Sequence, residues 1–275
     1  MRITSKLANG RWAGQGVFLL LGLALALSKA IALDNHDSMP ATGEAAEAVA
    51  TEAVATEAVA TEAVATPAVE AEQVGRTEEI AKTAKSPHEL VEGSTKALIE
   101  FIEQAKPYAN TETERYYREV ESLLSPVVDF KNFSRGVMAV HYKKATPEQR
   151  ERFRESFKWG LVKTYSLALT EFNDGEVSVL PPDREPDNPK RQRVKMEIRA
   201  PSGEVYPVVY ALRQNKSGRW RIYNLVVNGV NMGLTFRSQF ASAMKDRRYG
   251  GDLDQVIEAW ATVVADTDTN NESSG

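Results

Sequence analysis

The spacing of apolar residues changes to that of strands at Asn173-Asp174-Gly175. Before that point, apolar residues recur every three or four positions, which is the spacing of one helix face. After it, residues 193–200 alternate strictly between charged and apolar side chains, which is the spacing of a half-buried strand. Because helices come first and strands follow, the pattern predicts an α+β domain in which a helical portion packs on an antiparallel sheet.

Three helix starts carry capping residues. Ser86-Pro87-His88-Glu89 combines a Ser N-cap with Pro and Glu in the first turn, and Thr111-Glu112-Thr113-Glu114 and Thr146-Pro147-Glu148-Gln149 are further capping boxes. The third start predicts a long helix to about residue 172. Shorter helices are expected at 130–142, after Gly229 and after Asp252. The apolar face of the long helix consists of Phe153, Phe157, Leu161, Tyr165, Ala168 and Phe172.

Four strands are predicted at 176–180, 193–200, 204–213 and 219–228, joined by turns into an antiparallel meander. The last two are apolar on both faces, so each face requires cover from helices or from a ligand. Two helical layers without a cavity would satisfy the same pattern, and the sequence leaves both arrangements open. In the third strand, Val205, Pro207, Val209 and Ala211 fall on one face, and Tyr206, Val208, Tyr210 and Leu212 on the other.

Residues 1–32 have the three parts of a secretory signal peptide. Arg2, Lys6 and Arg11 supply positive charge, residues 17–27 form an 11-residue apolar run, and small residues allow cleavage near Ala32. A membrane-spanning helix needs about 20 apolar residues, so cleaved export is favoured over an uncleaved anchor. The chain has no cysteine, which argues against a lipid-modified N-terminus, disulfides and thiolate metal sites.

An acidic low-complexity spacer is expected at 33–82, where EAVAT occurs four times from Glu47 to Thr66. A five-residue period matches no helix repeat, so we expect this spacer to be disordered or weakly helical. The folded domain is expected at 83–265 and a polar tail at 266–275. Residues 80–264 hold 29 basic and 24 acidic side chains. This small surplus lacks the clustered basic face that nucleic-acid binding needs.

No pattern typical of catalysis is found in the sequence. His36, His88 and His141 share no metal-site or catalytic-triad spacing. Glu197 is the only carboxylate in the middle of a strand, and Lys195 and Arg199 beside it place it on the charged face. We therefore expect neither catalysis nor a metal or other cofactor. Two alternatives stay open, a small-molecule enzyme or hydrophobic-ligand sensor on the same sheet, and an exported adaptor whose EAVAT spacer tethers it to an assembly.

Three sequence blocks stand in order between roughly Ser86 and Val264. They are LSPVVDF at 124–130 with SRGVM at 134–138, ATPEQR at 145–150 with the aromatic residues that follow it, and WRIYNLVVNGV at 220–230 with FRSQF at 236–240. Together they resemble the MlaC family, also called the toluene-tolerance family of periplasmic ABC-transporter auxiliary proteins. The chain departs from the family pattern at Asn224, Asn228 and Asn231, usually Asp, Glu and Ser, and at Ala139 and Phe236, usually Gly and Tyr.

The resemblance implies a periplasmic phospholipid carrier. Such a carrier shuttles glycerophospholipid between an outer-membrane lipoprotein–porin complex and an inner-membrane ABC transporter complex, which helps to maintain outer-membrane lipid asymmetry. The implied fold joins the helical portion to a curved, NTF2-like sheet, with an apolar lipid cavity between them. We expect a monomer whose bound phospholipid is cargo.

The implied cargo sets the size of the cavity. Two acyl chains hold about 30 methylenes, and burial of each is favourable by ~0.8 kcal/mol. We therefore expect a cavity near the upper end of the usual ~300–1,000 Å³ range. The candidate lipid-binding residues are Val137, Met138, Phe157, Leu161, Tyr165, Met196, Ile198, Val208, Tyr210, Leu212, Val226, Met232 and Phe236.

Overall fold

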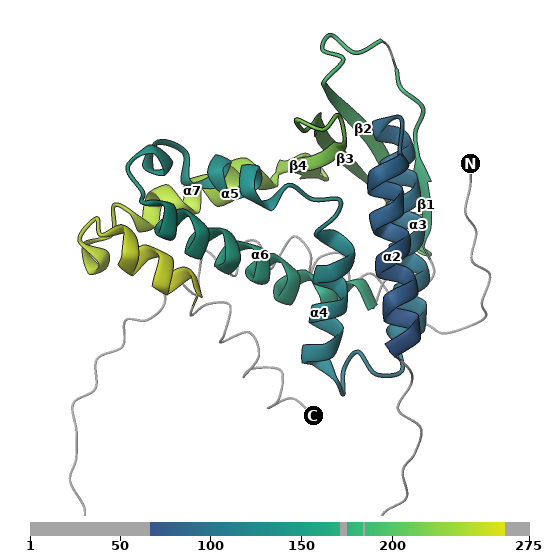
Figure 1. The fold of residues 1–275 in the computed structure, drawn as a ribbon, viewed down its shortest axis with the longest axis horizontal. Helices are drawn as coiled ribbons and strands as arrows, with labels where there is room; N and C mark the ends of the chain where they lie inside the picture. The colour runs from purple at the N-terminus through teal and green to yellow at the C-terminus, as the bar shows by residue number, and fades with distance from the viewer. Residues whose placement is uncertain (1–66, 171–174, 184, 262–275) are drawn as a thin grey trace, which may run out of the picture.

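The computed structural model describes residues 67–170, 175–183 and 185–261, which form a five-stranded antiparallel sheet with helices packed against it (Figure 1). The predicted signal peptide, the EAVAT repeats and the polar tail from residue 266 lie outside these residues. The α+β class predicted from the change of spacing is confirmed. Within the described ranges, no helix is long and apolar enough to cross a membrane.

Most of the helices precede the sheet in the sequence. They are α2 (Pro67–Thr83), α3 (Pro87–Ala105), α4 (Thr113–Leu124), α5 (Phe130–Met138), the short 3₁₀ helix η1 (Ala139–Lys143) and α6 (Pro147–Thr170). Helix α7 (Met232–Ala243) and the 3₁₀ helix η2 (Arg247–Tyr249) follow the strands. Residues 253–261 are again helical.

Two of the three predicted capping boxes are present. The Ser86 hydroxyl accepts a hydrogen bond from the Glu89 amide at 3.1 Å. The Thr146 hydroxyl accepts a hydrogen bond from the Gln149 backbone amide at 3.2 Å, and the Gln149 side-chain oxygen accepts one from the Thr146 backbone amide at 2.9 Å. The box predicted at Thr111 is wrong, because the Thr111 hydroxyl bonds the Tyr108 carbonyl and Glu112 at the N-cap forms no side-chain cap bond.

The sheet is a simple meander in the order β1-β2-β3-β4-β5. Its strands are β1 (Glu176–Val179), β2 (Arg191–Arg199), β3 (Val205–Gln214), β4 (Trp220–Val227) and the short β5 (Val230–Asn231). The register shifts between Ala211 and Leu212, which pair with Asn224 and Ile222, so Tyr223 is an extra residue in β4. Such a bulge reverses the alternation of side chains beyond it.

One face of the sheet is covered much better than the other. On the covered face, Val194, Met196 and Val208 are buried. On the opposite face, Val205 is 38% exposed and Pro207 is also exposed. The prediction that β3 is covered on both faces is therefore wrong at this end of the strand. The cause lies in the cross-strand neighbours, because Glu197 pairs with Pro207 and this charged side chain needs water.

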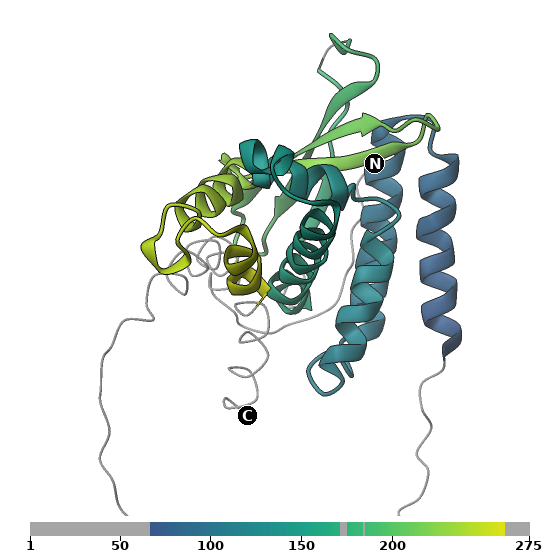
Figure 2. The ribbon, with the colours of Figure 1, turned by 60° about the vertical axis from the view of Figure 1, so that its left-hand side comes forward.

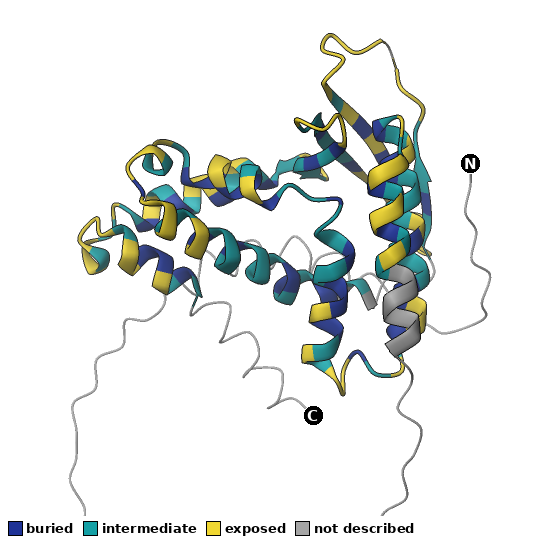
Figure 3. Cartoon of the chain, viewed as in Figure 1, coloured by how far each residue is buried: buried dark blue, intermediate teal, exposed yellow. Residues whose placement is uncertain are grey.

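The loop that connects β1 to β2 lies on the surface of the domain. The described residues from Pro181 to Lys190 are all exposed, and Figure 3 shows this loop projecting beyond the helices. Its polar, proline-rich sequence predicts such a loop. It contributes nothing to the interior, so the loop does not position the site described below.

The fold begins earlier in the chain than the predicted boundary at residue 83. The last part of the predicted spacer forms α2, which lies beside α3 in both views (Figures 1 and 2). Thr77 and Ala81 on α2 are buried. These small side chains let α2 approach its neighbours closely, although they produce no strong apolar pattern in the sequence.

An aromatic cluster lies in the interior between α5, α6, α7 and residues 253–261. Phe153 is fully buried, with its ring 4.8 Å from that of Phe240 and 5.5 Å from that of Trp260, both edge-on. Phe157 packs edge-on against Phe133 at 5.1 Å. Edge-to-face pairs of this kind add stability beyond the area that they bury.

Candidate functional site

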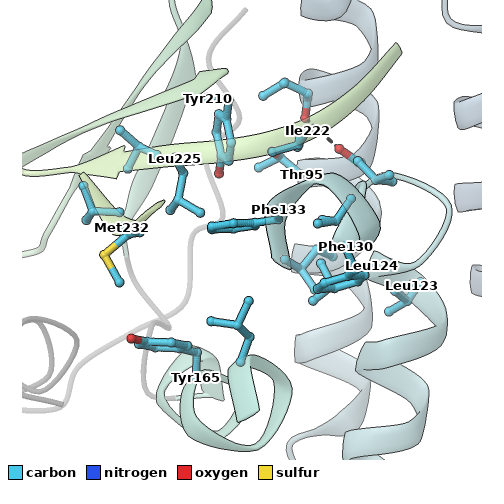
Figure 4. A pocket seen from close by; sticks show the side chains of 18 of the residues that line it. Thr95, Leu123, Leu124, Phe130, Phe133, Tyr165, Tyr210, Ile222, Leu225 and Met232 are labelled. Carbon is cyan, nitrogen blue, oxygen red and sulfur yellow. Dashed lines mark hydrogen bonds between the residues drawn. The ribbon is translucent and has the colours of Figure 1, made fainter. Parts of the chain in front are cut away.

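A cavity of about 560 Å³ lies between the sheet and the helices. Figure 4 shows Tyr210 and Leu225 approaching it from the strands, and Tyr165 approaching from α6 on the opposite side. The wall combines residues from six helices, four strands and the link after α4. They are Thr77, Val91, Ser94, Thr95, Leu98, Leu123, Leu124, Val127, Val128, Phe130, Phe133, Leu161, Tyr165, Ile198, Val208, Tyr210, Ile222, Leu225, Val227, Val230, Met232, Thr235 and Phe236.

The wall is almost entirely hydrocarbon. None of its side chains carries a charge, and its polar groups are hydroxyls. The Ser94 hydroxyl donates to the Leu90 carbonyl at 2.7 Å, within its own helix. The hydroxyls of Thr95 and Tyr210 both approach the Met196 sulfur, at 3.9 and 4.0 Å. Because these hydroxyls have partners in the protein, the cavity offers few polar contacts to a ligand.

The two tyrosines in the wall stay neutral over a wide pH range. Burial raises the pKa of Tyr165 to about 12 and the pKa of Tyr210 to about 12. The physical cause is the loss of water around the phenolate, which disfavours the charged form. The cavity therefore carries no charge on its wall at neutral pH.

Of the thirteen residues predicted from the sequence, seven line this cavity. They come from α6, from β2 and β3, and from α7, and the structure brings them together from segments far apart in the chain. These residues are Leu161, Tyr165, Ile198, Val208, Tyr210, Met232 and Phe236.

The other six predicted residues do not line the cavity. Val137, Met138 and Phe157 belong to the aromatic cluster. Met196 and Leu212 are buried among other side chains of the covered face. Val226 pairs with Val209 and lies on the opposite face, because the extra residue at Tyr223 makes Val227 the neighbour of Val208 instead.

The prediction missed all of the wall that α3 and α4 supply. Val91, Thr95 and Leu98 lie on α3, and Leu123 and Leu124 end α4. The apolar spacing of α3 indicates a buried face, but it does not show whether that face meets a cavity or other side chains. Phe130 and Phe133 of α5 were also missed, although they belong to the first sequence block and to its immediate continuation.

A buried carboxylate occurs elsewhere in the domain. Glu119 on α4 is 2% exposed and accepts hydrogen bonds from the Tyr108 hydroxyl and from Arg115, the latter at 2.8 Å. It is not part of the cavity wall. In the part of the chain that the structure describes, no group of three or more His, Asp or Glu side chains could hold a metal ion.

Two of the three asparagines that depart from the family pattern stabilise the start of α7, and the third, Asn228, lies in the turn between β4 and β5. Asn231 is the N-cap and accepts from the Leu234 amide at 3.1 Å. Asn224 donates to Asn231 at 3.0 Å and accepts from the Gly233 amide at 2.9 Å. The φ angles of Asn228 and Gly229 are 48° and 81°. Both lie in the left-handed region, where Asn and Gly are the favoured residues of a tight turn.

Comparison with known proteins places these features in a family. The family model described as MlaC protein matches residues 92–262. A toluene tolerance protein of Pseudomonas putida is 41% identical over 183 residues, which cover 66% of this chain and 83% of that protein. The intermembrane phospholipid transport system binding protein MlaC of Haemophilus influenzae is 29% identical over 157 residues, which cover 56% and 71% of the two chains.

A solved structure shares the fold. It is a phospholipid-binding protein from Ralstonia solanacearum in complex with a phospholipid, with a TM-score of 0.56 and 23% sequence identity. The alignment covers 64% of this chain and 96% of that one. The likeness therefore extends over nearly the whole of the solved protein, whereas about a third of this chain lies outside it.

Proposed function

This chain belongs to the MlaC family, as its three sequence blocks predicted, and from that premise we propose that it is a periplasmic phospholipid carrier. Cleavage near Ala32 would release the mature protein into the periplasm after export. The carrier takes glycerophospholipid between an outer-membrane lipoprotein–porin complex and an inner-membrane ABC transporter complex, and so helps to maintain outer-membrane lipid asymmetry. The name of the Haemophilus relative and the phospholipid in the Ralstonia structure support this proposal.

One observation carries the proposal, the uncharged cavity of about 560 Å³ between helices and sheet. Each methylene moved from water into such a space gains ~0.8 kcal/mol. An apolar wall without charged groups binds acyl chains through area alone and imposes no polar geometry on them. The polar headgroup then stays outside the wall, where water satisfies its hydrogen bonds.

The volume limits how much lipid the cavity holds as it stands. The volume of about 560 Å³ lies in the middle of the usual ~300–1,000 Å³ range. The expectation from two acyl chains was a volume near the upper end of that range. A dry cavity of about 150 Å³ accepts one benzene, so by proportion this cavity takes roughly 20 carbon atoms. Two ordinary acyl chains with about 30 methylenes exceed that amount. Carriage of both chains therefore requires a wider cavity or chains that extend through its mouth.

The two alternatives have less support. An enzyme or ligand sensor on this sheet would use a buried acid that faces the cavity, but the buried acid that the described residues contain, Glu119, belongs to α4 and faces Tyr108 and Arg115. An adaptor without cargo would be packed solid. The open space beside Leu161 and Tyr165 argues against that arrangement.

Mass spectrometry of the purified mature protein tests the proposal. We expect phospholipid to co-purify in near-stoichiometric amount, and the protein to take phospholipid from vesicles. A protein that is isolated without lipid and also fails to extract it from vesicles would contradict the proposal.

Two neighbouring valines on β4 provide a matched pair of variants. Val227 lines the cavity, whereas Val226 lies on the opposite face, and both are half-buried. Val227→Trp should fill part of the cavity and lower the bound lipid by roughly half or more, because the indole occupies a large share of a space of this size. Val226→Trp should leave lipid content near that of the parent protein. Equal lipid content in the two variants would show that lipid binds elsewhere.

A further inference from the structure

Helix α2 is part of the cavity wall, although it lies outside the matched family segment, which begins at residue 92. Thr77 on α2 is 2% exposed and lines the cavity together with Val91 of α3 and Leu123 of α4. Helix α2 contacts both α3 and α4. The wall of this protein's cavity therefore contains an element that the matched segment does not include.

The described side chains of α2 bury less large apolar surface than those of α4, a neighbouring helix of the wall. Of its side chains described from Val74 onward, only Thr77 and Ala81 are buried, and the largest apolar one, Ile80, is half-buried. By contrast, the shorter α4 buries four large side chains in the core, which are Tyr116, Tyr117, Val120 and Leu123. The burial of apolar area is the main force that holds one helix on another, so residues 74–83 of α2 contribute less of this force than α4 does.

An ion pair between α2 and α3 adds to this attachment. Arg76 pairs with Glu100, and the two side chains are 39% and 35% exposed. Water and salt screen a pair with this exposure, so its contribution is small. Residues 84–86 form a short non-helical link from α2 to α3, about which α2 can turn while staying close to the domain.

We propose that α2 is an added, movable wall of the lipid cavity, and that lipid enters and leaves where α2 lifts from α3 and α4. This inference rests on the proposed function. Lifting α2 removes Thr77 from the wall and opens the cavity beside Val91 and Leu123. It also supplies extra room for a second acyl chain. Elements that open for ligands are drawn from the least stable parts of a fold, and the small apolar burial of residues 74–83 fits that condition.

A disulfide between α2 and α3 tests the movement directly. A Cβ placed on Gly93 would lie 3.0 Å from Cγ2 of Ile80 and 3.4 Å from its Cγ1, so the two Cβ positions fall near the ~3.5–4.5 Å that a disulfide requires. The chain has no cysteine, so the pair Ile80→Cys/Gly93→Cys introduces its only thiols. The measurement is the transfer of a fluorescent phosphatidylglycerol from the full mature protein to acceptor vesicles, in the oxidised and reduced forms.

We expect the oxidised form to transfer lipid at least roughly tenfold more slowly, because local opening of α2 is then blocked. Reduction should restore the rate, and the two single-cysteine variants should be insensitive to the redox state. Equal rates in the oxidised and reduced forms would overturn the inference. If the unmodified protein transfers lipid and the disulfide has no effect, only this inference fails. If the unmodified protein takes up no lipid, the proposed function itself fails.

A second variant changes the attachment of α2 in the opposite direction. Glu100→Gln removes the partner of Arg76 and should raise the transfer rate roughly two- to fivefold, in line with the strength of exposed ion pairs. Glu103→Gln is the matched control, because Glu103 pairs with Lys106 at 2.6 Å, close to it in sequence at the C-terminal end of α3. An unchanged rate in Glu100→Gln, or an equal increase in both variants, would contradict a role for α2.

Discussion

The two halves of α6 present the same apolar face to different surroundings. In the first half, Phe153 and Phe157 are fully buried in the aromatic cluster with α5 and α7. In the second half, Leu161 and Tyr165 continue the same face and pack against the same cluster, yet they also border the cavity. The helix is the same and the spacing is the same. What differs is the burial, which is full for the two phenylalanines and partial for the two residues beside the cavity.

This difference shows what an apolar stripe does and does not indicate. The spacing of apolar residues identifies which side of a helix faces the interior. It contains no information on whether other side chains fill the interior opposite that stripe. In this protein the filled half of α6 stabilises the fold, and we propose that the open half binds cargo. Substitutions in the two halves should therefore affect different properties.

The largest expected effect is on the filled half. Phe153→Ala removes a fully buried ring that contacts Phe240 and Trp260, and should lower the free energy of unfolding by about 3–5 kcal/mol. Urea unfolding of lipid-free protein measures the change. A loss below about 1 kcal/mol would mean that the cluster is looser than the ring distances indicate.

A smaller effect is expected at alkaline pH on the open half. Burial raises the pKa of Tyr165 to about 12 from 10.0, so the unfolded chain ionises this group first as pH rises. The folded state therefore loses stability as the pH rises from 10 to 12, and the contribution is fully present below pH 10. Tyr165→Phe should remove about 2 kcal/mol of that loss. Unfolding measured at pH 9 and at pH 11.5 in both proteins tests this, and identical pH profiles would contradict it.

The smallest effect is expected from shortening a side chain that already borders open space. Leu161 is half-buried, so Leu161→Ala should cost about 1 kcal/mol or less in lipid-free protein, compared with the 2–5 kcal/mol of a filled core. The same urea measurement gives the value. If Leu161→Ala costs as much as Phe153→Ala, the two halves of α6 are equally packed and the contrast between them disappears.

Several features of the fold could be predicted because they depend on neighbours in the sequence. The caps at Ser86 and Thr146 involve residues three positions apart. The end of α4 before Pro126 follows from the proline itself, and the alternation in β2 follows from the geometry of one strand. These interactions form within a few residues, so the local sequence is sufficient to specify them.

Other features depended on partners that lie far away along the chain. Whether Val226 or Val227 faces the cavity depended on the extra residue at Tyr223. This extra residue can be identified only from the pairing of β4 with β3. The packing of α2 depended on surfaces of α3 and α4 that Thr77 and Ala81 fit. Neither local spacing nor composition predicts this strand register or this helix packing. The contacts that decide them join residues far apart in the sequence, whereas a spacing pattern relates only near neighbours.

The sequence by itself determined the element types, most of the helix starts, the order of helices and strands, and membership of the family. The tertiary structure alone decided where the interior stays open and which side chains border that space. The physical reason is that an empty volume belongs to no single segment. It is the space left when α3, α4, α5 and α6 and the strands reach their closest approach, and that separation depends on all their side chains together.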